Sequence, residues 1–237
     1  MIAHGGGQYN TLGVLMLGIG TLLDSMLAIR KRVYEDRSMS LKELTVRTLN
    51  NAPGSKNDYP CFGKPEPEIE GLAHYVSGEI CRHLLGITLP DGTKLSPSYF
   101  LFGADIMKDY PATPDGRLNG ERVSYGCMPS EWHDLSLTER LRAAAQITHD
   151  LTPNGSPAML SFSKDLLTPD KVKALIQGYF ELGGSHLHLN LQDKESLKEA
   201  RIHPEEHREL LVRVSGYSAP FVSMPDRWQQ ALIERMD

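Results

Sequence analysis

The chain has 237 residues, of which 40% are hydrophobic and 23% are charged, enough to bury the core of one large domain or two small ones. This composition excludes disorder, collagen and coiled coil for the chain as a whole, and a net charge of -5 gives no sign of a nucleic-acid-binding surface. Its three cysteines have no regular spacing, which argues against a disulfide framework and predicts a cytoplasmic protein.

A helical pattern extends over residues 10–34 and ends in a charged turn. Within it, the apolar run LGVLMLGIGTLL at residues 12–23 is too short to cross a membrane, and Asp24 follows it directly. No Lys or Arg precedes this run, as a signal peptide would require. We therefore expect a buried helix here and no membrane association.

Caps, chain breakers and periodicity predict the remaining elements. Ser40 and Glu43 have the spacing of a capping box and open a helix that ends near Leu49. Residues 51–67 are rich in Pro, Gly, Asn and Lys and predict an exposed loop, and residues 111–129 form a long irregular stretch. The other predicted helices cover residues 68–85, 137–147, 168–180, 194–200 and 225–235, and the predicted strands cover residues 98–106, 158–162, 186–191 and 211–215. The mixture is α/β in class, without a complete alternating series.

The sequence LVRVSGYSA at residues 211–219 carries the strongest indication of chemistry. It has the pattern of a hydrophobic strand with a buried-looking Arg, followed by a glycine at a tight turn. From the local residues alone, Gly216 needs only to supply a backbone conformation that other residues avoid. The same segment resembles the R-V-S-G-Y signature of the glycyl radical enzymes, the family that includes pyruvate formate-lyase and glycerol dehydratase.

Four other motifs resemble landmarks of that family and occur in its order along the chain. They lie at residues 18–29 (GIGTLLDSMLAI), 113–117 (TPDGR), 183–190 (GGSHLHLN) and 197–210 (LKEARIHPEEHREL). The resemblance implies the C-terminal part of a ten-stranded α/β barrel, mostly helical, with short strands and a buried C-terminal glycine loop. It divides the chain into a part of the barrel domain at residues 1–110 and a glycine radical domain at residues 111–237.

By position, the resemblance implies that Gly216 holds a stable carbon-centred radical. Glycine suits this role because the radical is delocalised between the amide nitrogen and the carbonyl group over a planar carbon, where a side chain would clash. Loop support is assigned to Arg213, Val214, Ser215, Tyr217 and Ser218. Of these, Arg213 and Tyr217 have the reach to bind backbone carbonyls. Asp115 and Arg117 of the TPDGR motif either face the substrate or stabilise their own turn.

In this family the stored radical acts through a cysteine on a facing loop, several hundred residues before the glycine. The cysteines of this chain are Cys61, Cys81 and Cys127, and we expect ordinary buried or loop thiols at all three positions. Cys127 follows a glycine, as the catalytic cysteine does, but its place in the order of motifs is wrong. We therefore expect the thiyl cysteine on a missing or separate N-terminal part.

The resemblance implies a radical lyase, dehydratase or decarboxylase of anaerobic metabolism, or a formate-lyase-like transferase, acting on a small organic substrate. It also implies an activating enzyme of the radical S-adenosylmethionine type, with a 4Fe-4S cluster, which removes a hydrogen from Gly216. No tightly bound cofactor is expected. His186 and His188 have a spacing compatible with metal binding, but no third ligand is evident in the sequence, so we expect no metal.

Several modes of action stay open at this stage. The chain could pair with a cysteine-bearing N-terminal partner chain as a split enzyme, or it could be a truncated reading frame that is inactive alone. It could also be a replacement radical subunit that repairs a full-length enzyme, although it is longer than that role needs. A fourth hypothesis is a non-catalytic binding protein that has lost the radical, but the intact RVSGYSA signature argues against it. In each case we expect an oligomer.

Overall fold

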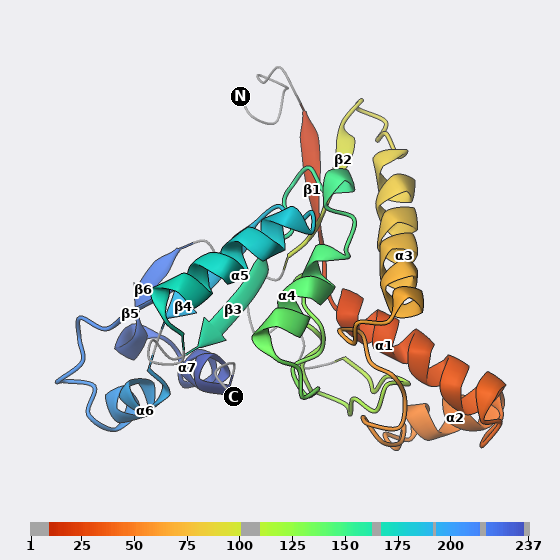
Figure 1. Ribbon diagram of the computed structural model, residues 1–237, viewed down its shortest axis with the longest axis horizontal. Helices are drawn as coiled ribbons and strands as arrows, with labels where there is room; N and C mark the ends of the chain where they lie inside the picture. The colour runs from red at the N-terminus through yellow and green to blue at the C-terminus, as the bar shows by residue number, and fades with distance from the viewer. Residues whose placement is uncertain (1–9, 101–109, 163–166, 192, 214–216, 235–237) are drawn as a thin grey trace.

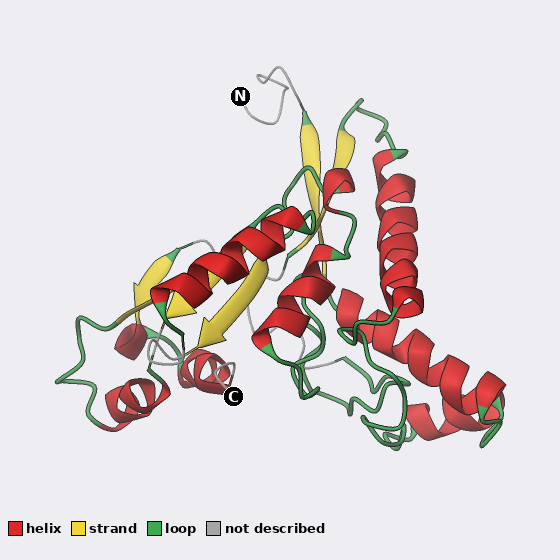
Figure 2. Ribbon diagram, viewed as in Figure 1, coloured by secondary structure: helices red, strands yellow, loops and turns green. Residues whose placement is uncertain are grey.

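The computed structural model describes residues 10–100, 110–162, 167–191, 193–213 and 217–234 of the chain. The described residues form a mixed α/β structure with short strands, arranged as three two-stranded sheets (Figures 1 and 2). No helix in these ranges is both long and apolar enough to cross a membrane.

The apolar run near the start of the chain is a strand followed by a helix, so the expected single helix over residues 10–34 is wrong in its first part. Strand β1 (Thr11–Met16) pairs in parallel with β2 (Lys94–Tyr99). Gly18 has a φ of 75°, a value that glycine adopts readily, and it caps α1 (Ile19–Ile29). A distant partner strand therefore decided the structure here, because a short apolar run alone fits a strand as well as a helix.

The burial predicted for this run holds for the helix but not for the strand. In α1 the side chains of Ile19, Leu23 and Leu27 are buried, whereas Leu12 and Leu15 of β1 are about half exposed. Helix α1 continues into a π-helical turn, η2 (Arg30–Glu35). Strand β2 begins four residues before its predicted start at residue 98, and residues 101–106 of the predicted strand lie outside the described residues.

The remaining helices lie close to their predicted positions. The capping boxes that begin α2 and α4 are both present, formed by Ser40 with Glu43 and by Ser136 with Glu139. The helices are α2 (Leu41–Leu49), α3 (Pro67–Leu85), α4 (Leu137–Ala145), α5 (Pro169–Glu181), α6 (Lys194–Ile202) and α7 (Asp226–Glu234), with short 3-10 turns at η4 (His149–Leu151) and η5 (Phe221–Ser223).

Two further strand pairs occupy the second half of the chain. Strands β3 (Ala158–Phe162) and β4 (Leu187–Leu191) are parallel, with α5 as their crossover helix, and β5 (Leu211–Arg213) pairs with β6 (Ser218–Pro220) in an antiparallel hairpin. Figure 1 shows this hairpin with α6 and α7 at the left, whereas β1, β2 and α3 lie at the right.

Two apolar clusters hold these elements together. The main core joins α1, α3, α4, β3 and α5, and it also takes in Tyr59, Cys61 and Phe62 from the loop that we expected to be exposed. This core draws on both sides of residue 110, where the domain boundary stays a prediction. A smaller core lies beneath the hairpin and consists of Leu197, Ala200, Val212, Phe221, Met224, Leu232 and Ile233.

Gly184 lies in the turn between the end of α5 and the start of β4. Gly183, with a φ of 96°, ends the helix, and a Cβ atom on Gly184 would overlap the ring of Tyr179, which is 1% exposed. We expect Gly184→Ala to lower the free energy of unfolding by about 1–3 kcal/mol, measured by urea denaturation, because the packed ring cannot move aside.

Gly71→Ala is the control, because Gly71 lies within α3 with no atom within 4 Å of an added Cβ. This change should raise stability by about 0.5–1 kcal/mol, since alanine favours a helix over glycine. Equal stability of the Gly184→Ala variant and the unchanged chain would contradict the packing described here.

Candidate functional site

The β5–β6 hairpin carries the segment that the sequence singles out. In its register Arg213 lies opposite Ser218 and Val212 opposite Ala219. The residues Val214, Ser215 and Gly216 lie outside the described residues. In the sequence, the candidate glycine thus falls between the last residue of β5 and the first residue of β6.

The flanks of this connection are more exposed in the chain than we expected. Val212 is 2% exposed and packs into the smaller core, but Arg213 and Ser218 are exposed and Tyr217 is 41% exposed. The buried position expected for Arg213 is therefore wrong in this structure. In a three-residue strand the side chains alternate between two faces, and only the face of Val212 meets the smaller core.

Strand β4 provides the surface behind the hairpin. The amide nitrogen Nδ2 of Asn190, a residue only 5% exposed, lies 3.4 Å from the carbonyl oxygen of Arg213 and 3.4 Å from Oγ of Ser161. The rings of His186 and His188 meet edge to face at 4.5 Å. Burial, helped by the nearby His186 and Arg213, lowers the pKa of His188 and favours its neutral form.

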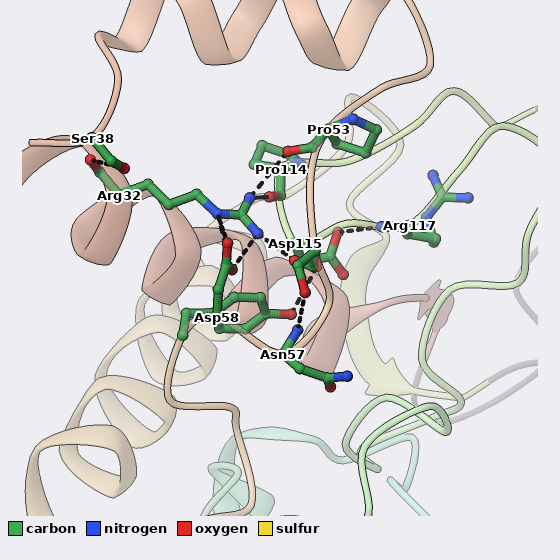
Figure 3. A network of polar contacts seen from close by, with 10 residues as sticks. Arg32, Ser38, Pro53, Asn57, Asp58, Pro114, Asp115 and Arg117 are labelled. Atoms are coloured by element: carbon green, nitrogen blue, oxygen red, sulfur yellow. Dashed lines mark hydrogen bonds and ion pairs between the residues drawn. The ribbon is translucent and has the colours of Figure 1, made fainter. Parts of the chain in front are cut away.

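The TPDGR loop does not lie beside the hairpin. It adjoins η2 at the end of α1, on the opposite side of the molecule in Figure 1. Asp115 and Arg117 are both fully buried. Figure 3 shows the surroundings of this loop.

Arg117 binds the backbone of its own loop. Its guanidinium donates hydrogen bonds to the carbonyl oxygens of Pro111, Leu118 (3.2 Å) and Glu121 (2.6 Å). The carboxylate of Asp115 accepts from the Thr113 hydroxyl and the Arg117 amide. These contacts favour the turn-stabilising alternative over a position facing substrate.

Arg32 is a second buried arginine, and the sequence analysis missed it. Its side chain is 3% exposed and pairs with Asp58 at 2.6 Å, and it donates to the carbonyl oxygens of Pro53, Ser55 and Pro114 (Figure 3). The guanidinium thus joins η2 to both long loops. In the sequence Arg32 stands in a charged turn, where nothing local distinguishes a buried arginine from its exposed neighbours.

Asp24 is a further buried charged group, and the sequence did give a signal for it, since it follows an apolar run directly. Its carboxylate accepts hydrogen bonds from the Ser130 hydroxyl (2.6 Å), the Phe62 amide (2.8 Å) and Nε2 of His133 (3.1 Å). Burial by itself would lower the pKa of His133, but its contacts with Asp24 and Cys61 outweigh burial and raise it to about 9. At neutral pH the raised pKa favours the protonated form of His133, which lies beside Asp24.

The three cysteines are buried and free. The thiol of Cys127 donates to the Ser156 carbonyl at 3.6 Å, and burial raises its pKa to about 12. Cys81 lies 3.8 Å from the Tyr99 hydroxyl. Burial of the thiols argues against a place for them on an open reaction surface.

One group of side chains in the described part of the chain has the spacing of a metal site. His203, Glu205 and Glu206 bring ligand atoms within 4.8 Å of one another, but all three are exposed, and exposed acidic groups commonly cluster without an ion. His186 and His188 belong to no such group in that part of the chain.

The Asp24–His133 pair makes stability depend on pH. Because the pKa of His133 rises from 6.5 to about 9 on folding, its stabilising contribution is complete below pH 6.5 and is lost as the pH rises through 9. In the unchanged chain, the free energy of unfolding should fall between pH 6.5 and 9 as His133 loses its proton. In His133→Gln this fall should be smaller by roughly 1–3 kcal/mol. Urea denaturation across this pH range measures the fall in the free energy of unfolding. The control His74→Gln, at an exposed histidine, should leave that fall unchanged. A wild-type slope in the His133→Gln variant would contradict the pairing.

The two alternatives for Arg117, loop support and substrate contact, predict different effects of its substitution on the free energy of unfolding. If it stabilises the loop, Arg117→Lys removes several bonds to buried carbonyls and should lower the free energy of unfolding by about 2–4 kcal/mol. The control Arg47→Lys, at an exposed arginine with one bond to Ala52, should change it by less than about 0.5 kcal/mol. Unchanged stability of Arg117→Lys would instead favour the substrate-facing alternative.

Comparisons with known proteins cover both parts of the chain. Residues 123–222 match the family described as "Glycine radical", and residues 1–107 match the family described as "Pyruvate formate lyase-like". Over the whole chain, the sequence is 25% identical to (2S)-3-sulfopropanediol dehydratase of Klebsiella oxytoca. Over 99% of the chain, it is 26% identical to trans-4-hydroxy-L-proline dehydratase of Clostridioides difficile.

Solved structures agree with this match. The glycerol-bound form of the B12-independent glycerol dehydratase from Clostridium butyricum superposes on 98% of the chain with a TM-score of 0.90 and 29% sequence identity. A glycyl radical enzyme from Archaeoglobus fulgidus covers 99% with a TM-score of 0.89 and 26% identity. The chain spans about 31% of the length of the curated relatives and 31–32% of these structures.

Proposed function

Because the chain belongs to the glycyl radical enzyme family and corresponds to its C-terminal portion, we propose that Gly216 is the residue that stores the radical. The position of this glycine in RVSGYSA, within residues 123–222 that match the glycine radical family, carries the proposal. The β5–β6 pairing supports it, since the segments that flank the glycine in the sequence are two hydrogen-bonded strands.

The other residues of the signature support the loop in this proposal. They are Arg213, Val214, Ser215, Tyr217 and Ser218. Val212 anchors the hairpin in the smaller core. A radical on Gly216 would be planar and delocalised over its amide and carbonyl groups, so its lifetime depends on a rigid and shielded loop.

The proposed sequence of steps moves one hydrogen atom at a time. An activating enzyme of the radical S-adenosylmethionine type, with a 4Fe-4S cluster, removes a hydrogen atom from the Cα of Gly216. The glycyl radical then takes a hydrogen atom from a cysteine thiol, and the resulting thiyl radical takes one from the substrate. The glycine returns to its closed-shell form in the second step and recovers the radical at the end of the cycle.

The cysteine of this cycle lies, we propose, on polypeptide outside these 237 residues. Burial of Cys61, Cys81 and Cys127 supports this assignment, as does the raised pKa of Cys127. The exposed hairpin flanks supply a surface on which that polypeptide could pack. Assembly is further supported by the half-exposed leucines of β1, at Leu12 and Leu15.

The reaction class follows from the relatives rather than from the site. Two of the most similar curated proteins are dehydratases of small organic molecules, as is a solved structure with a TM-score of 0.90. We therefore favour a radical dehydratase or lyase over a transferase. The proposed division is a barrel part at residues 1–110 and a glycine radical domain at residues 111–237.

Anaerobic electron paramagnetic resonance tests the radical directly. After incubation with a glycyl radical activating enzyme, S-adenosylmethionine and a reductant, we expect a doublet signal, because one hydrogen atom stays on Cα. Gly216→Ala should abolish the doublet, whereas the control Gly71→Ala on α3 should retain it.

A folded chain that gives no doublet with several activating enzymes would count against radical storage at Gly216. That outcome would favour the hypothesis that the chain is a non-catalytic remnant of the family. A doublet in the chain alone, followed by turnover only after a cysteine-bearing polypeptide is added, would support the split enzyme.

A further inference from the structure

The two faces of the β3–β4 sheet differ in chemistry. Ala158, Leu160 and Phe162 on β3 are buried in the main core, and in the parallel register they lie opposite Leu187, Leu189 and Leu191 on β4. The intervening pairs are Met159 with His188 and Ser161 with Asn190. Because side chains alternate along a strand, these pairs share the other face of the sheet.

Asn190 is the most enclosed polar residue of that second face. It is 5% exposed, although His188 on the same face is only partly buried. A buried amide is costly unless its polar atoms find partners. The amide nitrogen has two, Oγ of Ser161 on β3 and the carbonyl oxygen of Arg213 on β5, each at 3.4 Å.

The second of these contacts reaches the hairpin close to its connection. Arg213 is the last residue of β5 and pairs with Ser218, the first residue of β6. Arg213 therefore belongs to the paired residues of the hairpin that lie nearest to Gly216 in the sequence, and it precedes the glycine by three residues. Val212 fixes the same strand on the side of the smaller core.

We propose that Asn190 is a positioning residue that ties the glycine-bearing hairpin to the β3–β4 sheet through the main chain of Arg213. The proposal rests on the function proposed for Gly216. The radical needs a rigid connection, and a bond from a core sheet to the backbone supplies rigidity that does not depend on the exposed side chain of Arg213. Ser161 orients the amide from the neighbouring strand.

Two measurements on the full chain test this role. The first is hydrogen–deuterium exchange of the hairpin segment, which needs no radical. Asn190→Leu keeps a similar side-chain volume and removes the donor, so exchange in β5 and β6 should rise about tenfold while α3 and the β1–β2 sheet keep their protection. The exposed Asn50→Ala is the matched control and should leave exchange unchanged.

The second measurement is the radical itself. Under anaerobic activation, Asn190→Leu should lower the doublet intensity per chain, or shorten its lifetime, by about fivefold relative to the unchanged chain. Absence of the doublet in the unchanged chain would count against Gly216 as the radical site. If the unchanged chain gives the doublet and Asn190→Leu gives it with the same intensity and lifetime, the role of Asn190 is overturned and that of Gly216 is not.

Substitutions of Ser161 keep the proposal testable if Asn190→Leu does not fold. Ser161→Ala removes the orienting partner and should raise hairpin exchange by about threefold, whereas Ser161→Thr keeps the hydroxyl and should restore wild-type exchange. Unchanged exchange in Ser161→Ala, or an equal rise over the whole chain in any of these variants, would overturn the proposal, because a general packing role would not act on the hairpin selectively.

Discussion

Charged side chains without access to water are the constraint on which most of this structure depends. Asp24, Arg32 and Arg117 are all nearly or completely buried, and each must be matched by hydrogen bonds inside the protein. Their partners are mainly on the loops at residues 51–67 and 111–136. Two long segments without regular structure are thus fixed against α1 and η2 by these contacts, because a buried charge that lost its partners would destabilise the fold.

The hairpin that carries Gly216 is held in a different way. Its attachments include the apolar contacts of Val212 and Ala219 with the smaller core and the hydrogen bond from Asn190 to the Arg213 carbonyl. The hydrogen bond to the Arg213 carbonyl holds β5 through its main chain and does not involve the exposed side chain of Arg213. The function proposed for Gly216 requires that this segment meet an activating enzyme and then a cysteine, and a hairpin outside the polar network around Asp24 is compatible with that proposal.

The radical site proposed at Gly216 could be predicted from the sequence because the chemistry proposed there needs a particular residue type. A radical at Cα requires glycine, and the neighbouring RVS and YSA residues form a motif that can be recognised without a structure. The turn-stabilising alternative for Asp115 and Arg117 was also open from sequence, and the burial of both favours it. The helix start predicted at Ser40 was equally local, since a capping box involves only four consecutive residues.

What the sequence determined by itself was therefore the family motifs, the caps and the alternation of polar and apolar residues in HLHLNL. The tertiary structure decided which partner each segment meets. It made Thr11–Met16 a strand by pairing it with Lys94–Tyr99, buried Arg32 among carbonyls of both long loops, and placed Asn190 against Arg213. These outcomes depend on contacts between residues far apart in the chain, and local residue preferences carry no information about which distant group will satisfy a buried charge, an open strand edge or an amide.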